Sequence, residues 1–229
     1  MKKAFPIFGV LTALLLSYAL YQALVVAPTE QTMGDVQRIF YYHVPSAWTA
    51  FILFTINLIA SLVYLATRKP AADIMALVSA EVGVVFCSIV LVTGPIWARP
   101  VWGIWWTWDM RLTSTLVLWL IYVSYLVLRR FSSGGETPLL AAALAIFGAL
   151  CVPFVYFSIW FFRTQHPQPV IGGGGSIDPR MLHVLLINWL AFSCFAFLIC
   201  WSRYRLEEIQ REVEAAHATQ SLTTPGSAR

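Results

Sequence analysis

The sequence predicts an all-α polytopic membrane protein with six transmembrane helices and both termini in the cytoplasm. The 229 residues are 59% hydrophobic and only 11% charged, which is too little charge to cover the surface of a soluble domain of this size. Six apolar stretches are each about long enough to cross a bilayer. Basic residues gather at alternate ends of these stretches, which fixes the direction of each span.

The six predicted spans follow one another with short connections. A spanning helix needs roughly 20 apolar residues, and such stretches cover residues 5–26, 46–66, 74–93, 114–128, 139–162 and 181–201. The fourth is short and would lengthen by taking in Leu112 and Thr113. The first has an alternative interpretation as a secretory signal with Lys2 and Lys3 as its basic region, although its apolar run exceeds the roughly 7–15 residues of a signal core. We interpret residues 1–201 as a membrane domain and residues 202–229 as a cytoplasmic tail.

The distribution of Lys and Arg orients the spans, because basic residues are retained on the cytoplasmic side. Ten lie at one set of helix ends: Lys2, Lys3, Arg68, Lys69, Arg129, Arg130, Arg203, Arg205, Arg211 and Arg229. Five lie at the other: Arg38, Arg99, Arg111, Arg163 and Arg180. The connections 28–45, 94–113 and 163–180 are therefore predicted to lie outside. They are richer in Trp, Tyr, Pro and Gly than the inner connections, so function is expected there.

Reactive and charged residues are few within the spans. The four cysteines, Cys87, Cys151, Cys194 and Cys200, form no Cys-x-x-Cys and no Cys-x-x-Cys-His, which argues against dithiol redox chemistry and against covalent haem attachment. Glu81 lies in the third span, where an unpaired charge is costly. We expect it to face the helix bundle, either protonated or bonded to a group such as Asn57. In the tail, Leu206, Ile209 and Val213 recur at helical spacing and predict a short amphipathic helix before a disordered end.

The predicted outer connection 94–113 is unusually rich in tryptophan. Five of the ten tryptophans fall within twelve positions between the third and fourth spans: Trp97, Trp102, Trp105, Trp106 and Trp108. An interfacial aromatic belt would instead scatter them over many helix ends. Because Gly103, Pro95 and Pro100 are expected to break regular helix here, the pattern indicates a shaped apolar platform for a flat, aromatic ligand.

Asp109 and Arg111 end this platform, just before the fourth span. Asp109 is expected to support the loop, either by capping backbone amides or by pairing with Arg111. Two roles stay open for Arg111, which are structural support and contact with a ligand carboxylate.

Two histidines occupy matching places near the outer boundary. His43 comes just ahead of the second span, and His183 lies in the first turns of the sixth. The positive end of a helix dipole disfavours imidazolium and leaves neutral imidazole available to bind iron. The pair therefore fits bis-histidine ligation of haem, with simple anchoring at a helix end as the alternative for each. His166, in an outer connection without a helical frame, and His217, in the tail, are not assigned to the site.

The segment 102–113, WGIWWTWDMRLT, resembles the tryptophan-rich signature of the haem-handling membrane proteins of cytochrome c maturation. Asp109 is followed by Met-Arg-Leu-Thr, which looks like the CcmC (haem exporter protein C) branch. In related members the aspartate is usually followed by Pro and an acidic residue. The segments 94–101 and 43–48 are also similar. Together with the six spans, the short chain and the three outer loops, they extend the resemblance to essentially everything except the tail.

The resemblance implies a protein that is not an enzyme. It implies haem b held without covalent attachment at the outer face of a bacterial inner membrane, with the functional loops on the periplasmic side. It also implies delivery to the haem chaperone CcmE, with the ABC transporter subunits CcmA and CcmB and the small subunit CcmD as further partners. On this sequence the implied iron ligands are His43 and His183. The implied platform that meets haem and chaperone is Trp102, Trp105, Trp106, Trp108 and Asp109.

The propionate groups of haem are expected to meet outer arginines. Outer placement and charge alone make Arg38, Arg99, Arg111 and Arg180 the candidates.

Two other classes of function stay open. A b-type cytochrome that carries electrons usually buries its haem between helices within the membrane, whereas both predicted ligands lie at the outer edge. A small-solute transporter that used the aromatic loop as a gate would place polar residues along several spans, and only Glu81 and a few amides are present there. The sequence therefore favours haem delivery.

Overall fold

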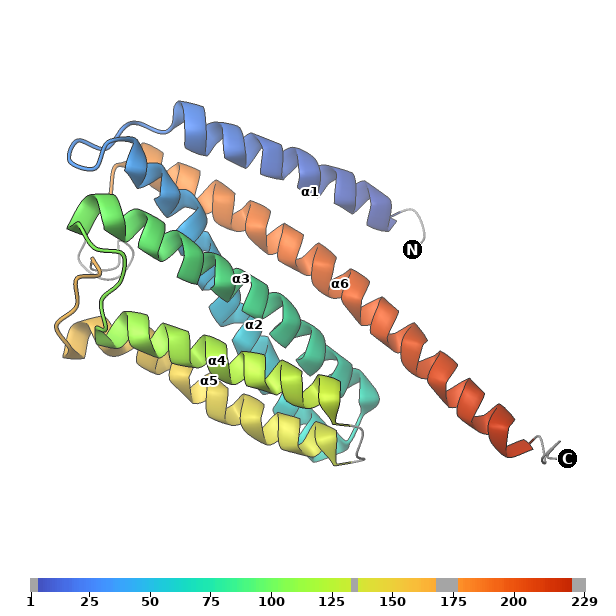
Figure 1. The fold of residues 1–229 in the computed structure, drawn as a ribbon. Helices are drawn as coiled ribbons and strands as arrows, with labels where there is room; N and C mark the ends of the chain where they lie inside the picture. Colours follow the sequence, from blue (N-terminus) through green and yellow to red (C-terminus); the bar gives the residue numbers. More distant parts are fainter. Residues whose placement is uncertain (1–3, 133–135, 168–176, 224–229) are drawn as a thin grey trace, which may run out of the picture.

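The computed structural model describes residues 4–132, 136–167 and 177–223 and consists of helices (Figure 1). The elements are α1 (Ala4–Tyr21), a π-helical turn (Gln22–Val26), a 3-10 turn (Asp35–Ile39), α2 (Phe40–Thr67), α3 (Pro70–Trp102), α4 (Met110–Phe131), α5 (Thr137–Phe161) and α6 (Pro179–Thr223). All six predicted spans are present as helices long and apolar enough to cross a membrane. The predicted fold class, an all-α protein with six such helices, is confirmed.

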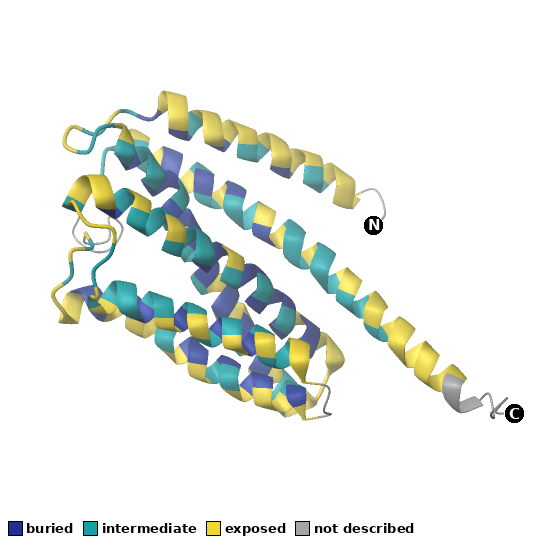
Figure 2. Ribbon diagram, in the orientation of Figure 1, coloured by how far each residue is buried: buried dark blue, intermediate teal, exposed yellow. Residues whose placement is uncertain are grey.

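The helices form a bundle around α2. Helix α2 packs against α3, α5 and α6, while α4 packs against α3 and α5. Helix α1 packs mainly along α6 at the edge of the bundle, and most of its surface is exposed (Figure 2). That surface carries apolar side chains such as Val10 and Leu14, which lipid tails solvate well. We call the end that carries residues 27–39, 103–109 and 162–167 the outer end, and the opposite end the inner end.

Glycine allows the closest helix contacts. The rings of Phe54 on α2 and Tyr122 on α4 stack with their centroids 3.9 Å apart, and Gly83 on α3 lies against the Phe54 ring. A Cβ atom at position 83 would come within 2.7 Å of Phe54 Cε1. Small residues of this kind let membrane helices approach closely, so the centre of the bundle is tightly packed.

Two helix boundaries differ from the prediction and change the outer end. Helix α2 begins at Phe40, so His43 lies inside the helix and not ahead of it. Helix α3 continues to Trp102 with Pro95 and Pro100 inside it, so the expectation that these prolines break the helix is wrong. A proline removes one backbone hydrogen bond, and a membrane helix tolerates this where neighbouring groups compensate. The break comes at Gly103, whose φ of 78° suits glycine.

The predicted boundary between the membrane domain and the tail, at residues 201 and 202, lies within one continuous helix. Helix α6 is a single helix of 45 residues, so the expected short tail helix is continuous with the sixth span. The predicted disordered end falls largely on residues 224–229, which lie outside the described residues.

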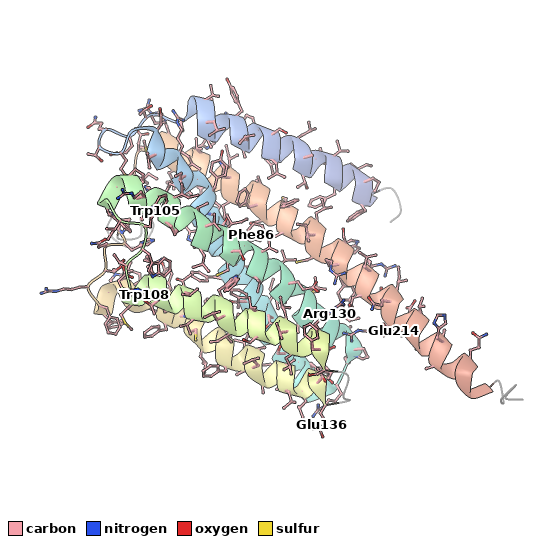
Figure 3. All side chains as sticks on the ribbon, viewed as in Figure 1. Phe86, Trp105, Trp108, Arg130, Glu136 and Glu214 are labelled. Carbon is pink, nitrogen blue, oxygen red and sulfur yellow. The ribbon has the colours of Figure 1, made fainter. Side chains whose placement is uncertain are left out.

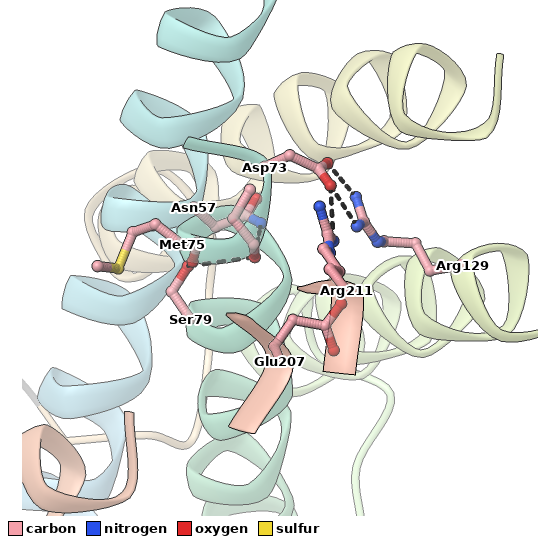
Figure 4. Close-up of polar contacts among 8 residues, drawn as sticks. Asn57, Asp73, Met75, Ser79, Arg129, Glu207 and Arg211 are labelled. Atoms are coloured by element: carbon pink, nitrogen blue, oxygen red, sulfur yellow. Dashed lines mark hydrogen bonds and ion pairs between the residues drawn. The ribbon is translucent and has the colours of Figure 1, made fainter. Parts of the chain in front are cut away.

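Ion pairs join three helices at the inner end (Figure 4). Asp73 on α3 accepts hydrogen bonds from both terminal nitrogens of Arg129 on α4, with Nη2 2.8 Å from Oδ2. Arg211 on α6 contacts the same carboxylate at 2.9 Å and also pairs with Glu207. We call Asp73, Arg129, Glu207 and Arg211 the inner cluster, and its effect is to tie α3, α4 and α6 together.

Glu81 is paired, but not with the predicted partner. Its carboxylate accepts two hydrogen bonds from Arg203 on α6, at 2.9 and 3.0 Å. Asn57 donates instead to the carbonyl oxygen of Ala76, at 2.7 Å. The expectation that Glu81 bonds Asn57 is therefore wrong, because α6 extends far enough to bring an arginine beside Glu81.

Candidate functional site

A cavity lies at the outer end between α2, α3 and α4. The empty space between its walls, including the open mouth, is about 1110 Å³. Helix α3 contributes one long wall from Cys87 to Trp102, and residues 165–167 cover part of the outer side. Beside the deep end, Trp119 Nε1 on α4 donates to Ser88 Oγ on α3 at 2.8 Å. The cavity is therefore lined mostly by apolar side chains, and a hydrogen bond joins α3 to α4 beside its deep end.

Two histidines meet in this cavity. His43, buried near the start of α2, and His166, between α5 and α6, both line it. Their ring centroids are 6.4 Å apart. Histidine nitrogens bind metals at about 2.0–2.1 Å, so two rings this close together could both hold one metal ion. The spacing suits a metal held between the two rings.

Hydrogen bonds leave the same nitrogen free on each ring. The Thr93 hydroxyl donates to the carbonyl oxygen of Ile89 at 2.7 Å, so it accepts from His43 Nδ1, 2.8 Å away. The carbonyl oxygen of Pro167 can only accept, so His166 Nδ1, 3.0 Å away, is the donor. Each neutral ring then has its lone pair on Nε2, which is the arrangement of a metal-binding histidine whose other nitrogen is fixed.

The His166 ring is neutral at physiological pH. Burial, together with the positive charge of Arg111 nearby, lowers the pKa of His166 to about 4. A neutral ring is the form that can bind iron.

His183 does not lie in this cavity. It is exposed on α6 and lines a separate pocket beside Gln22 and Val26. On α2, Tyr41 belongs to the cluster that packs with Val184 and Leu185, whereas His43 bonds Thr93 of α3. Residues two positions apart on a helix do not share a face. The structure therefore does not bring His43 and His183 into one pocket, and the histidine that it places beside His43 is His166.

The predicted tryptophan platform divides into two groups. Trp102 and Trp106 line the cavity together with Trp97. Trp105 and Trp108 are 59% and 75% exposed and lie at the outer end (Figure 3). Residues 103–109 connect α3 to α4 without forming a helix, so neighbouring tryptophans can point in different directions. Trp102 and Trp106 therefore form part of the cavity wall, whereas Trp105 and Trp108 form part of the exposed surface.

Three donors on the cavity wall have no acceptor within the described part of the chain. They are Arg111 Nη1, Trp97 Nε1 and Trp106 Nε1. Buried donors are nearly always paired in folded proteins. A guanidinium and indole N–H groups on the wall of one cavity suit a carboxylate ligand.

The other arginine candidates are occupied elsewhere. Arg38 donates to the carbonyl oxygens of Ala23 and Ala27. Arg99 donates to the carbonyl oxygen of Gly103, and Arg180 pairs with Asp178. Of the four predicted arginines, Arg111 is the one found among the described residues that line the cavity.

The comparisons with known proteins identify the family. The model of the CcmC family, described as heme exporter protein C, matches residues 1–219. The chain belongs to the haem exporter protein C family.

Relatives of this family come from bacteria and plants. The heme exporter protein C of Bradyrhizobium diazoefficiens is 34% identical over 222 residues, covering 96% of this chain and 84% of the relative. That of Escherichia coli K12 is 34% identical over 174 residues, covering 76% and 69%. A putative cytochrome c biosynthesis ccmC-like mitochondrial protein of Marchantia polymorpha is 34% identical over 185 residues, covering 80% and 78%.

Sequence reasoning missed His166 because its place depends on how residues 162–167 fold back over the cavity. No hydrophobic period extends into that segment. The available signal was its position in a predicted outer connection, a property that His43 and the tryptophans of residues 102–108 share. The connection continues through residues 168–176, which lie outside the described residues.

Proposed function

We propose that the protein holds haem b without covalent attachment in the outer cavity and delivers it to the haem chaperone CcmE. Its family supports a role in haem handling for cytochrome c maturation. The observation that carries the proposal is the meeting of His43 and His166, each with Nε2 free, in one apolar cavity. We further propose the bacterial inner membrane as its location, with the outer end in the periplasm and both termini in the cytoplasm.

Different residues are proposed to contact the iron, the carboxylates and the ring of the haem. His43 and His166 would ligate the iron, while Arg111 and the indole groups of Trp97 and Trp106 would meet the carboxylates. Apolar walls limit access of water. Exposed Trp105 and Trp108 offer a surface for the chaperone, and CcmA, CcmB and CcmD are the proposed further partners.

The geometry also supports release, which a delivery protein needs and an electron carrier does not. His43 is set in a long helix, whereas His166 lies on a non-helical segment. Movement of this segment would remove one ligand without disturbing α2. We therefore favour delivery over electron transfer, and the protein is proposed to act without catalysing a reaction.

Absorption spectra test the ligand assignment. Purified protein with haem is expected to give a six-coordinate, low-spin spectrum, which His43→Ala and His166→Ala should each lose. His183→Ala is the matched control and should keep it. A full six-coordinate signal in His166→Ala, or its loss in His183→Ala, would show that the ligand pair is wrong.

Thr93→Val tests how His43 is oriented. The variant removes the acceptor for Nδ1–H while nearly preserving side-chain shape, so we expect haem affinity to fall about 10–100-fold. Thr93→Ser keeps the hydroxyl and should stay close to the unmodified protein. Haem titration followed by absorbance measures both affinities, and equal values for the two variants would contradict the role of Thr93.

A further inference from the structure

We propose that Asp109 is a positioning residue for His166 and acts through the hydroxyl of Thr164. The inference rests on the proposed function, because it concerns one of the proposed iron ligands. Asp109, which follows the exposed Trp108 in the tryptophan-rich segment, would then help to hold an iron ligand in place.

A short chain of hydrogen bonds connects the two residues. Thr164 Oγ1 donates to Asp109 Oδ2 at 2.9 Å. The same Thr164 oxygen accepts from the backbone N–H of His166 at 3.1 Å. The carboxylate thus fixes the hydroxyl that fixes the backbone of the histidine.

Asp109 is itself held in place. Its Oδ1 accepts from the backbone N–H of Leu112 at 2.9 Å, which caps the N-terminus of α4. The expected cap is therefore present, whereas no ion pair to Arg111 is found among the described residues. One carboxylate anchors both the start of α4, which carries Arg111, and the segment that carries His166.

The segment 162–167 has little else to hold it. It lacks the repeating backbone bonds of a helix. Among the described residues, the Thr164–Asp109 contact is the only hydrogen bond that ties this segment to a part of the chain other than α5. Removing it should let His166 move away from the iron position.

Two threonines make a matched pair for the experiment. Thr107 Oγ1 also donates to Asp109 Oδ2, at 3.2 Å, but in the described part of the chain it forms no hydrogen bond with His166. We expect Thr164→Val to increase the rate of haem loss about tenfold and to lower the six-coordinate fraction. Thr164→Ser should restore both values, and Thr107→Val should leave both unchanged.

Asp109→Asn separates capping from positioning. Asparagine caps helices about as well as aspartate, but its amide nitrogen cannot accept the Thr164 hydroxyl. We expect this variant to resemble Thr164→Val. Added imidazole should restore the six-coordinate spectrum in both, because it replaces a displaced ligand and does not repair a misfolded protein.

The outcomes separate this inference from the proposed function. If Thr164→Val behaves like the unmodified protein, or Thr107→Val is impaired equally, Asp109 does not position His166. If His166→Ala itself keeps the six-coordinate signal, the ligand assignment fails instead.

Discussion

Replacing Arg129 by alanine is expected to destabilise the folded protein by about 3 kcal/mol, the lower end of the roughly 3–5 kcal/mol range for breaking a buried ion pair. The side chains of Arg129 and Asp73 are only 8% and 5% exposed, so the variant leaves a buried carboxylate with less compensation. Arg211 still contacts Asp73, which is why the lower end applies. Denaturant unfolding in detergent measures the change.

Arg130 is the control for this prediction. It is the exposed neighbour of Arg129, and Arg130→Ala should change stability by less than about 0.5 kcal/mol. The double variant Asp73→Ala with Arg129→Ala should recover part of the loss, because neither charge is then left alone. Equal effects of the two single arginine variants would contradict the importance of the inner cluster.

Replacing Arg111 by alanine is expected to weaken haem retention by about 10–100-fold. A hydrogen bond to a charged group contributes roughly 1.5–3 kcal/mol, and Arg111 Nη1 is buried on the cavity wall without a partner in the described chain. Transfer of haem to an excess of a soluble haem-binding protein measures the rate of loss.

Two further variants define what Arg111 supplies. Arg111→Lys keeps the charge but not the planar pair of donors, so it should recover only part of the retention. Arg180→Ala removes an outer arginine that does not line the cavity and should have no effect. A loss in Arg180→Ala as large as that in Arg111→Ala would mean that overall positive charge, and not contact, holds the haem.

The six helices could be predicted because each follows from a local property, namely an apolar run long enough for a bilayer. The boundaries could not. Helix α3 continues through Pro95 and Pro100, where its outer part contacts α2 through Thr93 and Trp97. Helix α6 continues past Trp201, where Arg203 and Arg211 pair with carboxylates on α3. Both depend on tertiary contacts that no local pattern contains.

The candidate site, like the helices, could be predicted only where a local sequence pattern identifies its residues. His43, Arg111 and Trp106 were identified from a local motif, and all three line the cavity. His166 lies in a segment whose path is set by a hydrogen bond to Asp109, 55 residues away in sequence. His183 lines a different pocket from His43, because two residues at the same depth in the membrane need not lie on the same side of α2.

The bond between Trp119 and Ser88 has a mechanical consequence. It is the hydrogen bond between α3 and α4 nearest the outer end in the described chain. Beyond it, α3 continues for about 21 Å to Trp102 at 1.5 Å per residue. If this length tilted rigidly about Ser88 by about 10°, its tip would shift by about 4 Å. Such a displacement is comparable to the thickness of a stacked aromatic ring, and the bond between Thr93 on α3 and His43 on α2 opposes it, so this one bond restrains the mouth of the cavity as well as the imidazole ring.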